Sequence, residues 1–95
     1  MEIIVRYNSV YLKNASLGKG FADMAADLIV DKLGRVKVYV GSKLSFYTDL
    51  DHLPFEILDA ISKGLEKEVN NRILIRIKER VSSHMSMKEK ENQKT

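Results

Sequence analysis

A run of alternating charged and apolar side chains near the C-terminus is the feature of this sequence best suited to chemistry. Residues 72–81 read Arg-Ile-Leu-Ile-Arg-Ile-Lys-Glu-Arg-Val. In a strand, successive side chains point to opposite faces of the sheet. A strand here would bury its isoleucines and expose a row of cations, namely Arg72, Arg76, Lys78 and Arg80. Such a row is suited to contacts with phosphate groups.

A second candidate is the tripeptide Gly18-Lys19-Gly20, which precedes a predicted helix. Free backbone N–H groups at a helix start, together with a lysine, can hold a phosphate or sulfate. The segment is too short for a P-loop, so we treat it as a weak anion site, with a plain turn as the simpler interpretation. An enzyme that used this loop on a small phosphorylated compound would need a general base or a nucleophile beside it, and none is present.

Asp49, Asp51 and His52 form the one cluster in which acids lie beside a histidine. Carboxylates at the start of a helix accept hydrogen bonds from its free N–H groups and favour its dipole. We therefore interpret this cluster as a helix cap rather than a catalytic or metal site. The sequence predicts no catalytic residue, no metal ligand and no cofactor, and hence a protein that is not an enzyme.

Composition narrows the class of protein further. The 95 residues suffice for one domain, and the absence of cysteine excludes disulfides, thiolate metal sites and a cysteine nucleophile. We find neither a signal peptide nor a membrane-length apolar run, so we expect a soluble, cytoplasmic protein without a membrane partner. Residues 72–95 have a net charge of +4 and residues 1–71 a net charge of −1, which favours a polyanionic partner.

The first half of the chain predicts a strand, a helix and a hairpin. Residues 2–12 are rich in β-branched and aromatic types, with a bulge or tight turn at Asn8-Ser9. Residues 21–33 have apolar side chains at helical spacing and an acidic stripe, Asp23, Asp27 and Asp31. Strands at 35–40 and 44–47 follow. A three-residue loop between them, 41–43, places Val40 opposite Leu44 and Val38 opposite Phe46.

The second half predicts a helix from Pro54 to about Val69 and then the strand at 72–81. We expect residues 1–82 to form a single α+β domain and residues 83–95 a flexible polar tail. One alternative stays open. Apolar residues recur every fourth position from Ile57 to Val81, so a single helix over 54–82 also fits. The Asn70-Asn71 pair and the density of isoleucine favour a break and a strand.

This order, βαββαβ, is that of the ferredoxin-like split arrangement: a four-stranded antiparallel sheet with two helices on one face. Alternation then predicts which side chains lie on the open face of the sheet. They are the candidate nucleic-acid-binding residues Arg6, Lys37, Tyr39, Tyr47, Arg72, Arg76, Lys78 and Arg80. The acids, including Asp27 and Asp31, would lie on the helices behind.

A basic sheet face with tyrosines is suited to single-stranded RNA or DNA, because phosphates pair with cations and bases stack on rings. The plan resembles that of the RNA recognition motif, although residues 43–48 lack that family's Lys/Arg-Gly-aromatic opening. Edge strands also carry cations simply to prevent aggregation. The alternative function is therefore a protein-interaction or assembly module, such as a homodimeric regulator or inhibitor of viral or mobile-element type, without a nucleic-acid role.

Overall fold

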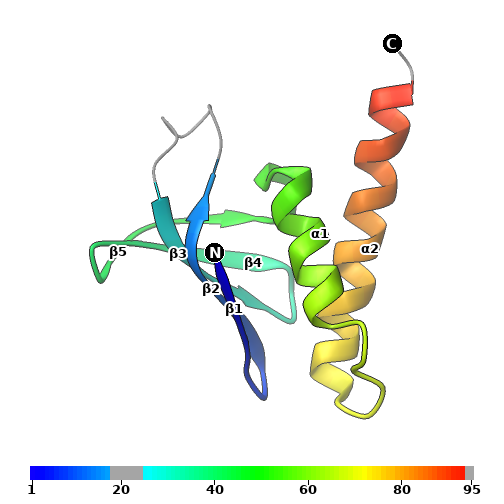
Figure 1. The fold of residues 1–95 in the computed structure, drawn as a ribbon, viewed down its shortest axis with the longest axis horizontal. Coiled ribbons are helices and arrows are strands. Elements are labelled where there is room, and N and C mark those ends of the chain that lie inside the picture. The colour runs from blue at the N-terminus through cyan, green and yellow to red at the C-terminus, as the bar shows by residue number, and fades with distance from the viewer. Residues whose placement is uncertain (18–24, 94–95) are drawn as a thin grey trace.

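Within residues 1–17 and 25–93, which the computed structural model describes (side chains as far as Lys88), the chain forms a five-stranded sheet followed by two helices (Figure 1). The strands are β1 (Glu2–Val5), β2 (Ser9–Ser16), β3 (Ala25–Asp31), β4 (Arg35–Val40) and β5 (Lys43–Asp49). A short 3-10 helix, η2 (Leu50–His52), leads into α1 (Phe55–Gly64) and then α2 (Arg72–Gln93).

Each strand pairs antiparallel with the next one along the chain, in the order β1-β2-β3-β4-β5. The prediction of an α+β fold with an antiparallel sheet and two helices is confirmed. The described sheet has five strands rather than four, and both helices follow the strands, so the ferredoxin-like βαββαβ order is not confirmed. The difference arises at residues 25–31, which form a strand where a helix was predicted, and at residues 72–81, which form a helix where a strand was predicted.

The turns set the register of the sheet. Arg6 N donates to Ser9 O over 2.9 Å, which makes a tight β1–β2 turn near the predicted Asn8-Ser9 interruption. The β4–β5 turn has two residues, Gly41 and Ser42, both with positive φ (58° and 71°). Our three-residue loop was therefore wrong.

The predicted apolar alignment across β4 and β5 is recovered only in part. Val40 faces Lys43 rather than Leu44, as the two-residue turn requires. A bulge next to Val38 then restores the Val38–Phe46 pair. The extra residue of the bulge thus reconciles a tight turn with the Val38–Phe46 pair, while Leu44 pairs with Tyr39 and stays 44% exposed.

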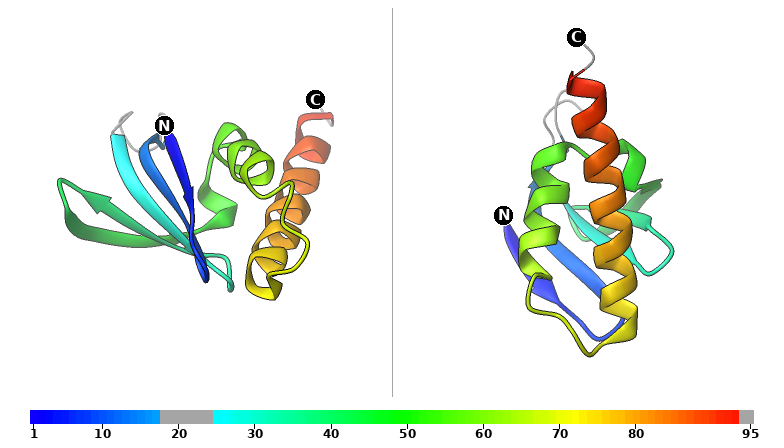
Figure 2. Two further views of the ribbon diagram at one scale, coloured as in Figure 1. Left: turned by 60° about the horizontal axis from the view of Figure 1, so that its bottom comes forward. Right: turned by 90° about the vertical axis from the view of Figure 1, so that its right-hand side faces the viewer.

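Both helices cover the same face of the sheet (Figure 2). Alternate residues of β2, β3 and β4 point into this layer and are completely buried: Val10, Leu12, Leu28, Val30, Val36 and Val38. From the helices, Leu58 and Ile61 of α1 and Leu74, Ile77 and Val81 of α2 complete the core. Burying each such side chain contributes about 1.5–3 kcal/mol, so this layer provides most of the stability.

The predicted strand over 72–81 is wrong, because this segment is the first half of α2. Leu74, Ile77 and Val81 are spaced at i, i+3 and i+7, which places them on one helical face, and at most 3% of each is exposed. A fifth strand was already supplied by the first half of the chain. Residues 72–81 instead form part of the second helix, which helps to cover the apolar face of the sheet.

The predicted helix over 21–33 is also wrong where the structure describes it, since residues 25–31 form β3. Ala26, Leu28 and Val30 are buried, while Asp27 and Asp31 lie on the opposite face. The acidic stripe therefore lies on the outer face of the sheet and not on a helix. Asp23, like Gly18, Lys19 and Gly20 of the weak anion site, lies outside the described residues.

Residues 83–93 are helical and continue α2, and the flexibility expected of residues 83–95 stays a prediction. Met85 packs against the core, and His84 Nδ1 lies 2.7 Å from Asp51 Oδ1 in η2. Lys88 Nζ donates to Asp51 O over 3.3 Å. These contacts hold the second half of α2 against the rest of the molecule.

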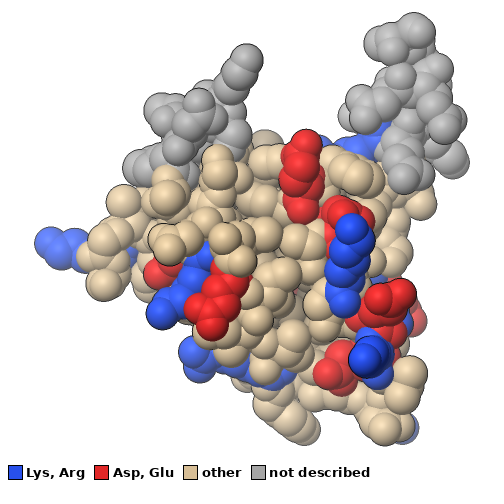
Figure 3. Space-filling model, in the orientation of Figure 1, with Lys and Arg blue, Asp and Glu red and all other residues tan. Residues whose placement is uncertain are grey.

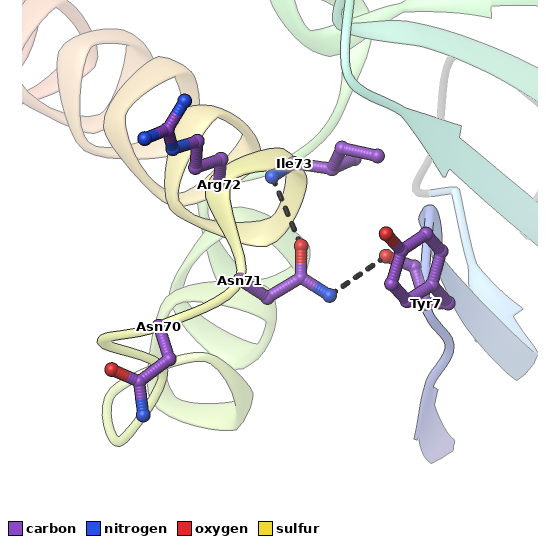
Figure 4. A pocket seen from close by; sticks show the side chains of 5 residues that line it. All are labelled: Tyr7, Asn70, Asn71, Arg72 and Ile73. Atoms are coloured by element: carbon purple, nitrogen blue, oxygen red, sulfur yellow. Dashed lines mark hydrogen bonds between the residues drawn. The ribbon is translucent and has the colours of Figure 1, made fainter.

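Asn71 fixes the start of α2 through three side-chain hydrogen bonds. Figure 4 draws those to Ile73 and Tyr7. Asn71 Oδ1 accepts from the N–H groups of Ile73 (3.0 Å) and Leu74 (3.2 Å), as an N-cap does. Asn71 Nδ2 donates to Tyr7 O in the β1–β2 turn over 2.9 Å. One side chain thus caps the helix and connects it to the sheet.

We predict that Asn71→Ala lowers the free energy of unfolding by about 1–2 kcal/mol, because it removes a cap and the bond to Tyr7 O. Urea unfolding followed by circular dichroism measures the change. Asn70→Ala is the matched control, because Asn70 is exposed and makes no side-chain hydrogen bond within the described residues. Equal effects of the two substitutions would contradict the prediction.

Candidate nucleic-acid interface

A row of side chains crosses the outer face of the sheet, the face turned away from the helices. The strand pairing places Ile4, Tyr11, Ile29, Lys37 and Tyr47 opposite one another across the five described strands. Lys37 and Tyr47 thus lie on the outer face, as the sequence predicts. Tyr39 lies on the same face, two residues from Lys37 along β4.

Arg6 also lies by this face, with its guanidinium carbon 5.2 Å from the centre of the Tyr11 ring. At this distance the cation is attracted by the face of the ring. The contact holds Arg6 over β2 and near the outer row. Four residues of the predicted set, Arg6, Lys37, Tyr39 and Tyr47, are therefore brought to one side of the sheet.

The other four predicted residues lie on α2 rather than on the sheet. Arg72, Arg76 and Arg80 are exposed and follow each other at intervals of four residues, so they line one side of the helix. Lys78 is half-buried, and its Nζ donates to Glu66 O over 3.2 Å. The expected single basic sheet face is thus divided between the two layers of the molecule.

The β3–β4 turn brings these two layers together at one end of the sheet. Gly34 has a positive φ of 79°, and its backbone packs against both layers. A Cβ added at Gly34 would lie 3.4 Å from Leu50 Cδ1 and 3.6 Å from Arg80 Cδ. The aliphatic part of Arg80 therefore lies over this turn, next to the cations Lys32 and Arg35 that flank Gly34.

Four adjoining hollows run around this end of the molecule and form what we call the hairpin-end furrow. The first, of about 410 Å³, lies at the start of α2 and is drawn in Figure 4. The others have volumes of about 240, 220 and 280 Å³, and neighbouring hollows share Ile73, Asn8, Asp31 or Lys37. The lining residues on which the argument depends are Tyr7, Lys32, Arg35, Lys37, Tyr47 and Arg72.

Positive charge dominates the furrow. Among its described lining residues, four are cationic (Lys32, Arg35, Lys37 and Arg72), and Asp31 is the one acid. By contrast, on the face drawn in Figure 3 the acidic and basic side chains are interspersed, without a large area of one sign. The face in that view therefore does not collect cations as the furrow does.

Asp31 is occupied by the turn that it organises. Its Oδ1 accepts from the backbone N–H groups of Leu33 (2.9 Å) and Arg35 (3.0 Å), and its Oδ2 accepts from Arg35 Nε over 3.2 Å. These bonds fix the backbone of the β3–β4 turn and hold the Arg35 side chain in place. Only Arg35 of the four cations is paired in this way within the described residues.

Further along the outer face, Tyr11, Asp27 and Tyr39 line another hollow of about 230 Å³, which adjoins the furrow through the half-buried Ile29. Tyr11 Oη donates to Asp27 Oδ2 over 3.0 Å, and the backbone N–H of Asn14 donates to Asp27 Oδ1 over 3.1 Å. The hydrogen bond to Asp27, and then desolvation, raise the pKa of Tyr11 above its ordinary value of 10.0. The Asp27 carboxylate thus favours the protonated form of the Tyr11 phenol. It also places a negative charge on a part of the outer face that was predicted to be basic.

The predicted acid–histidine cluster lies around η2 at the end of β5, where Asp49 pairs with Arg35 of β4. His52 Nδ1 lies 2.7 Å from Asp49 Oδ1, and this hydrogen bond lowers the pKa of Asp49. Asp49 is the N-cap residue of η2, but its side chain bonds to His52 and not to a backbone N–H. No group of three potential metal-ligating side chains is found within the described part of the chain.

Sequence reasoning missed Tyr7, Lys32 and Arg35 as members of the site. Each lies in or beside a turn. The sequence of a turn does not indicate which residues, or which layer of the molecule, the turn will contact. The Leu33-Gly34 pair was a usable signal, because a glycine after an apolar run marks a turn as readily as a helix end. As a turn, it would have placed Lys32 and Arg35 at an end of the sheet.

Comparison with known proteins gives no relative: no family model, no curated protein and no solved structure matches this chain. None of the described helices is long and apolar enough to cross a membrane. The assignment of a function therefore depends on the residues and their geometry.

We predict that Asp27→Asn lowers the pKa of Tyr11 toward 10.0, because it removes the negative charge that the phenolate would face. The raised pKa of Tyr11 stabilises the fold at pH below about 10, and this contribution is lost as the pH rises through the folded-state pKa. The Tyr11 Cζ chemical shift, followed by NMR between neutral and alkaline pH, measures the change. Asp59→Asn, which removes a carboxylate of α1 paired with Lys63, is the control. An unshifted Tyr11 midpoint in Asp27→Asn would refute the assignment.

Proposed function

We propose that this protein is a small, non-enzymatic nucleic-acid-binding module whose interface is the hairpin-end furrow. The observation that carries the proposal is the collection of Lys32, Arg35, Lys37 and Arg72 in adjoining hollows that contain one described acid, Asp31. Phosphate groups are the ligands that such a row of cations fits, since binding releases condensed counterions from the nucleic acid.

The neighbouring arginines of α2 extend this surface. The Arg80 stem lies over Gly34, and Arg76 lies one turn away on the same side of the helix. Neither forms an ion pair within 4.0 Å among the described residues, so both guanidinium groups remain available to phosphates. Guanidinium groups also form paired hydrogen bonds with phosphate oxygens, which lysines do not.

The backbone positions of the furrow's cations are fixed by the fold, and the side chain of Arg35 is also held by Asp31. Lys37 is held on β4 between Ile29 and Tyr47, and Arg72 begins α2 directly after the Asn71 cap. Lys32 and Arg35 are presented by the rigid β3–β4 turn. Such preorganisation reduces the conformational entropy lost on binding, which supports a specific interface over a diffuse basic surface.

We predict that the triple substitution Lys32→Gln, Lys37→Gln and Arg72→Gln weakens nucleic-acid binding and flattens its salt dependence. Loss of three phosphate contacts reduces the slope of log K against log salt concentration by about 2 for a single strand. Fluorescence anisotropy with a labelled oligonucleotide, repeated over a range of salt concentrations, measures both quantities.

A control with the same change in net charge separates local contacts from a general charge effect. Lys13, Lys43 and Lys63 lie on β2, on the β4–β5 hairpin and on α1, away from the furrow. Their triple substitution by glutamine is expected to retain most of the affinity. Equal losses in the two triple variants, or binding by the wild type that is insensitive to salt, would refute the furrow as the interface.

A second candidate function, self-assembly, is favoured by the apolar side chains of the outer face, of which Ile29 also lines the furrow. Ile4 and Ile29 flank Tyr11 there and are only half-buried, while Leu44 near the β4–β5 turn is 44% exposed. Apolar side chains on an uncovered sheet face are suited to a symmetric contact with a second copy.

For this second function we predict a dimer that Ile29→Lys converts to a monomer, because a cation at the centre of the contact would be buried without a partner. Light scattering coupled to size exclusion measures the mass of both proteins. Lys63→Glu, at an exposed position of α1 on the other side of the sheet, is the control. A wild-type protein that stays monomeric at high concentration excludes this function and leaves the furrow proposal unaffected.

A further inference from the structure

The hairpin-end furrow has an exposed tyrosine at each of its two ends. The Tyr7 residue, in the β1–β2 turn, is 78% exposed and lines the first hollow together with Arg72. The Tyr47 residue, on β5, is 64% exposed and lines the last hollow together with Arg35 and Lys37. Neither side chain makes a hydrogen bond within the described part of the chain, so the fold itself uses neither ring for a polar contact.

An exposed ring beside a cation provides the two kinds of contact that one nucleotide needs. The base stacks on the aromatic face, and the phosphate pairs with the cation. Figure 4 shows the Tyr7 ring on one side of the first hollow and Arg72 on the other, with the Asn71 side chain between them. Since Asn71 Nδ2 donates to Tyr7 O, the backbone that carries the ring is held in place.

The path of the furrow favours a flexible ligand. It begins at the start of α2, passes the β1–β2 and β3–β4 turns and ends on the outer face at β5. This change from one layer to the other occurs within a molecule whose radius of gyration is 12.9 Å. A duplex is stiff over about 150 base pairs and resists so tight a bend, whereas an unpaired strand follows it at little cost.

We infer that the furrow binds an unpaired nucleic-acid strand, with one base stacked on Tyr7 and another on Tyr47. Between these two positions the strand follows Arg72, Lys32, Arg35 and Lys37 through its phosphates. This inference rests on the proposed function and adds the strandedness of the ligand and two base-stacking positions. Tyr39 lies outside the furrow, in the hollow that Tyr11 and Asp27 share, and takes no part.

The test compares wild type and variants for binding to oligo(dT) and oligo(rU) of about 12 nucleotides, within the usual size of single-strand sites, and to a DNA duplex of equal length. Tyr7→Leu/Tyr47→Leu removes both rings but keeps apolar side chains. Tyr7→Phe/Tyr47→Phe keeps the rings, and Tyr39→Leu removes a ring outside the furrow. Thermal unfolding followed by circular dichroism confirms that each variant is folded.

We expect the wild type to prefer the single strands to the duplex, and the ratio of its affinities for oligo(dT) and oligo(rU) distinguishes DNA from RNA as the ligand. The double leucine variant should lose on the order of tenfold or more in single-strand affinity for each ring. Its weak duplex binding, and the single-strand affinities of the phenylalanine and Tyr39 variants, should be unchanged.

Two results overturn the inference, and they differ from failure of the proposed function. Single-strand affinity that is the same in the double leucine variant as in the wild type would exclude stacking on these rings. A preference for the duplex would exclude the unpaired strand. In either case a steep salt dependence that requires Lys32, Lys37 and Arg72 would still support the furrow. Absence of binding to all three ligands at low salt would refute the furrow proposal as well.

Discussion

Burial of one face of the five-stranded sheet beneath α1 and α2 is the constraint on which the rest of this structure depends. Three consecutive strands each turn at least two fully buried side chains toward the helices, including Leu12, Leu28 and Val38. A sheet this apolar on one face is not stable in water without a covering layer. The helices supply that layer through Ile61, Ile77 and their neighbours. Because α2 must lie on the sheet, its start is brought to the β1–β2 and β3–β4 turns, and the furrow is created where they meet.

The sequence predicted the composition of the fold better than its order. The strands at 2–12 and 35–47 and the helix after Pro54 are found close to their predicted positions. Their signals were local: alternation of valine with polar residues in β4, and a proline beside the first turn of α1. Local signals of this kind do not depend on which partner the segment meets, so they survive the error in topology.

Both misassigned segments contain apolar or acidic residues spaced by four. Four residues are close to one helical turn, and four is also an even number, so such residues share a face in a helix and in a strand alike. Asp27 and Asp31 lie on one face of β3, and Ile73 and Ile77 lie near one face of α2, although the spacing is the same. What distinguishes the two segments is the layer that each must join, a tertiary requirement that overrides the weak helical preference of isoleucine and aspartate.

The exchange of these two segments also explains why the candidate site was found only in part. Lys37, Tyr47 and Arg72 were identified from the sequence, and all three line the furrow. The error lay in assigning their charges to one sheet face, whereas Asp27 and Asp31 now share that face and Arg72, Arg76 and Arg80 lie on α2. Positive charge instead collects where the start of α2 meets the β1–β2 and β3–β4 turns. Lys32 and Arg35 belong to the site for that reason, since the β3–β4 turn is the part of the sheet that Arg80 overlies.

One residue, Asn71, contributes both to the stability of the fold and to the geometry of the proposed binding site. Asn71 caps α2 and so fixes the backbone from which Arg72 projects, and through Tyr7 O it also fixes the turn that carries the Tyr7 ring. The ring and the guanidinium are therefore placed on either side of one hollow by the same side chain (Figure 4). The backbone segments that carry the ring and the guanidinium are already ordered in the folded protein. A base that enters this hollow therefore does not have to order them, and binding does not lose that entropy. Loss of the Asn71 bonds should consequently weaken single-strand binding in the folded protein as well as destabilise the fold.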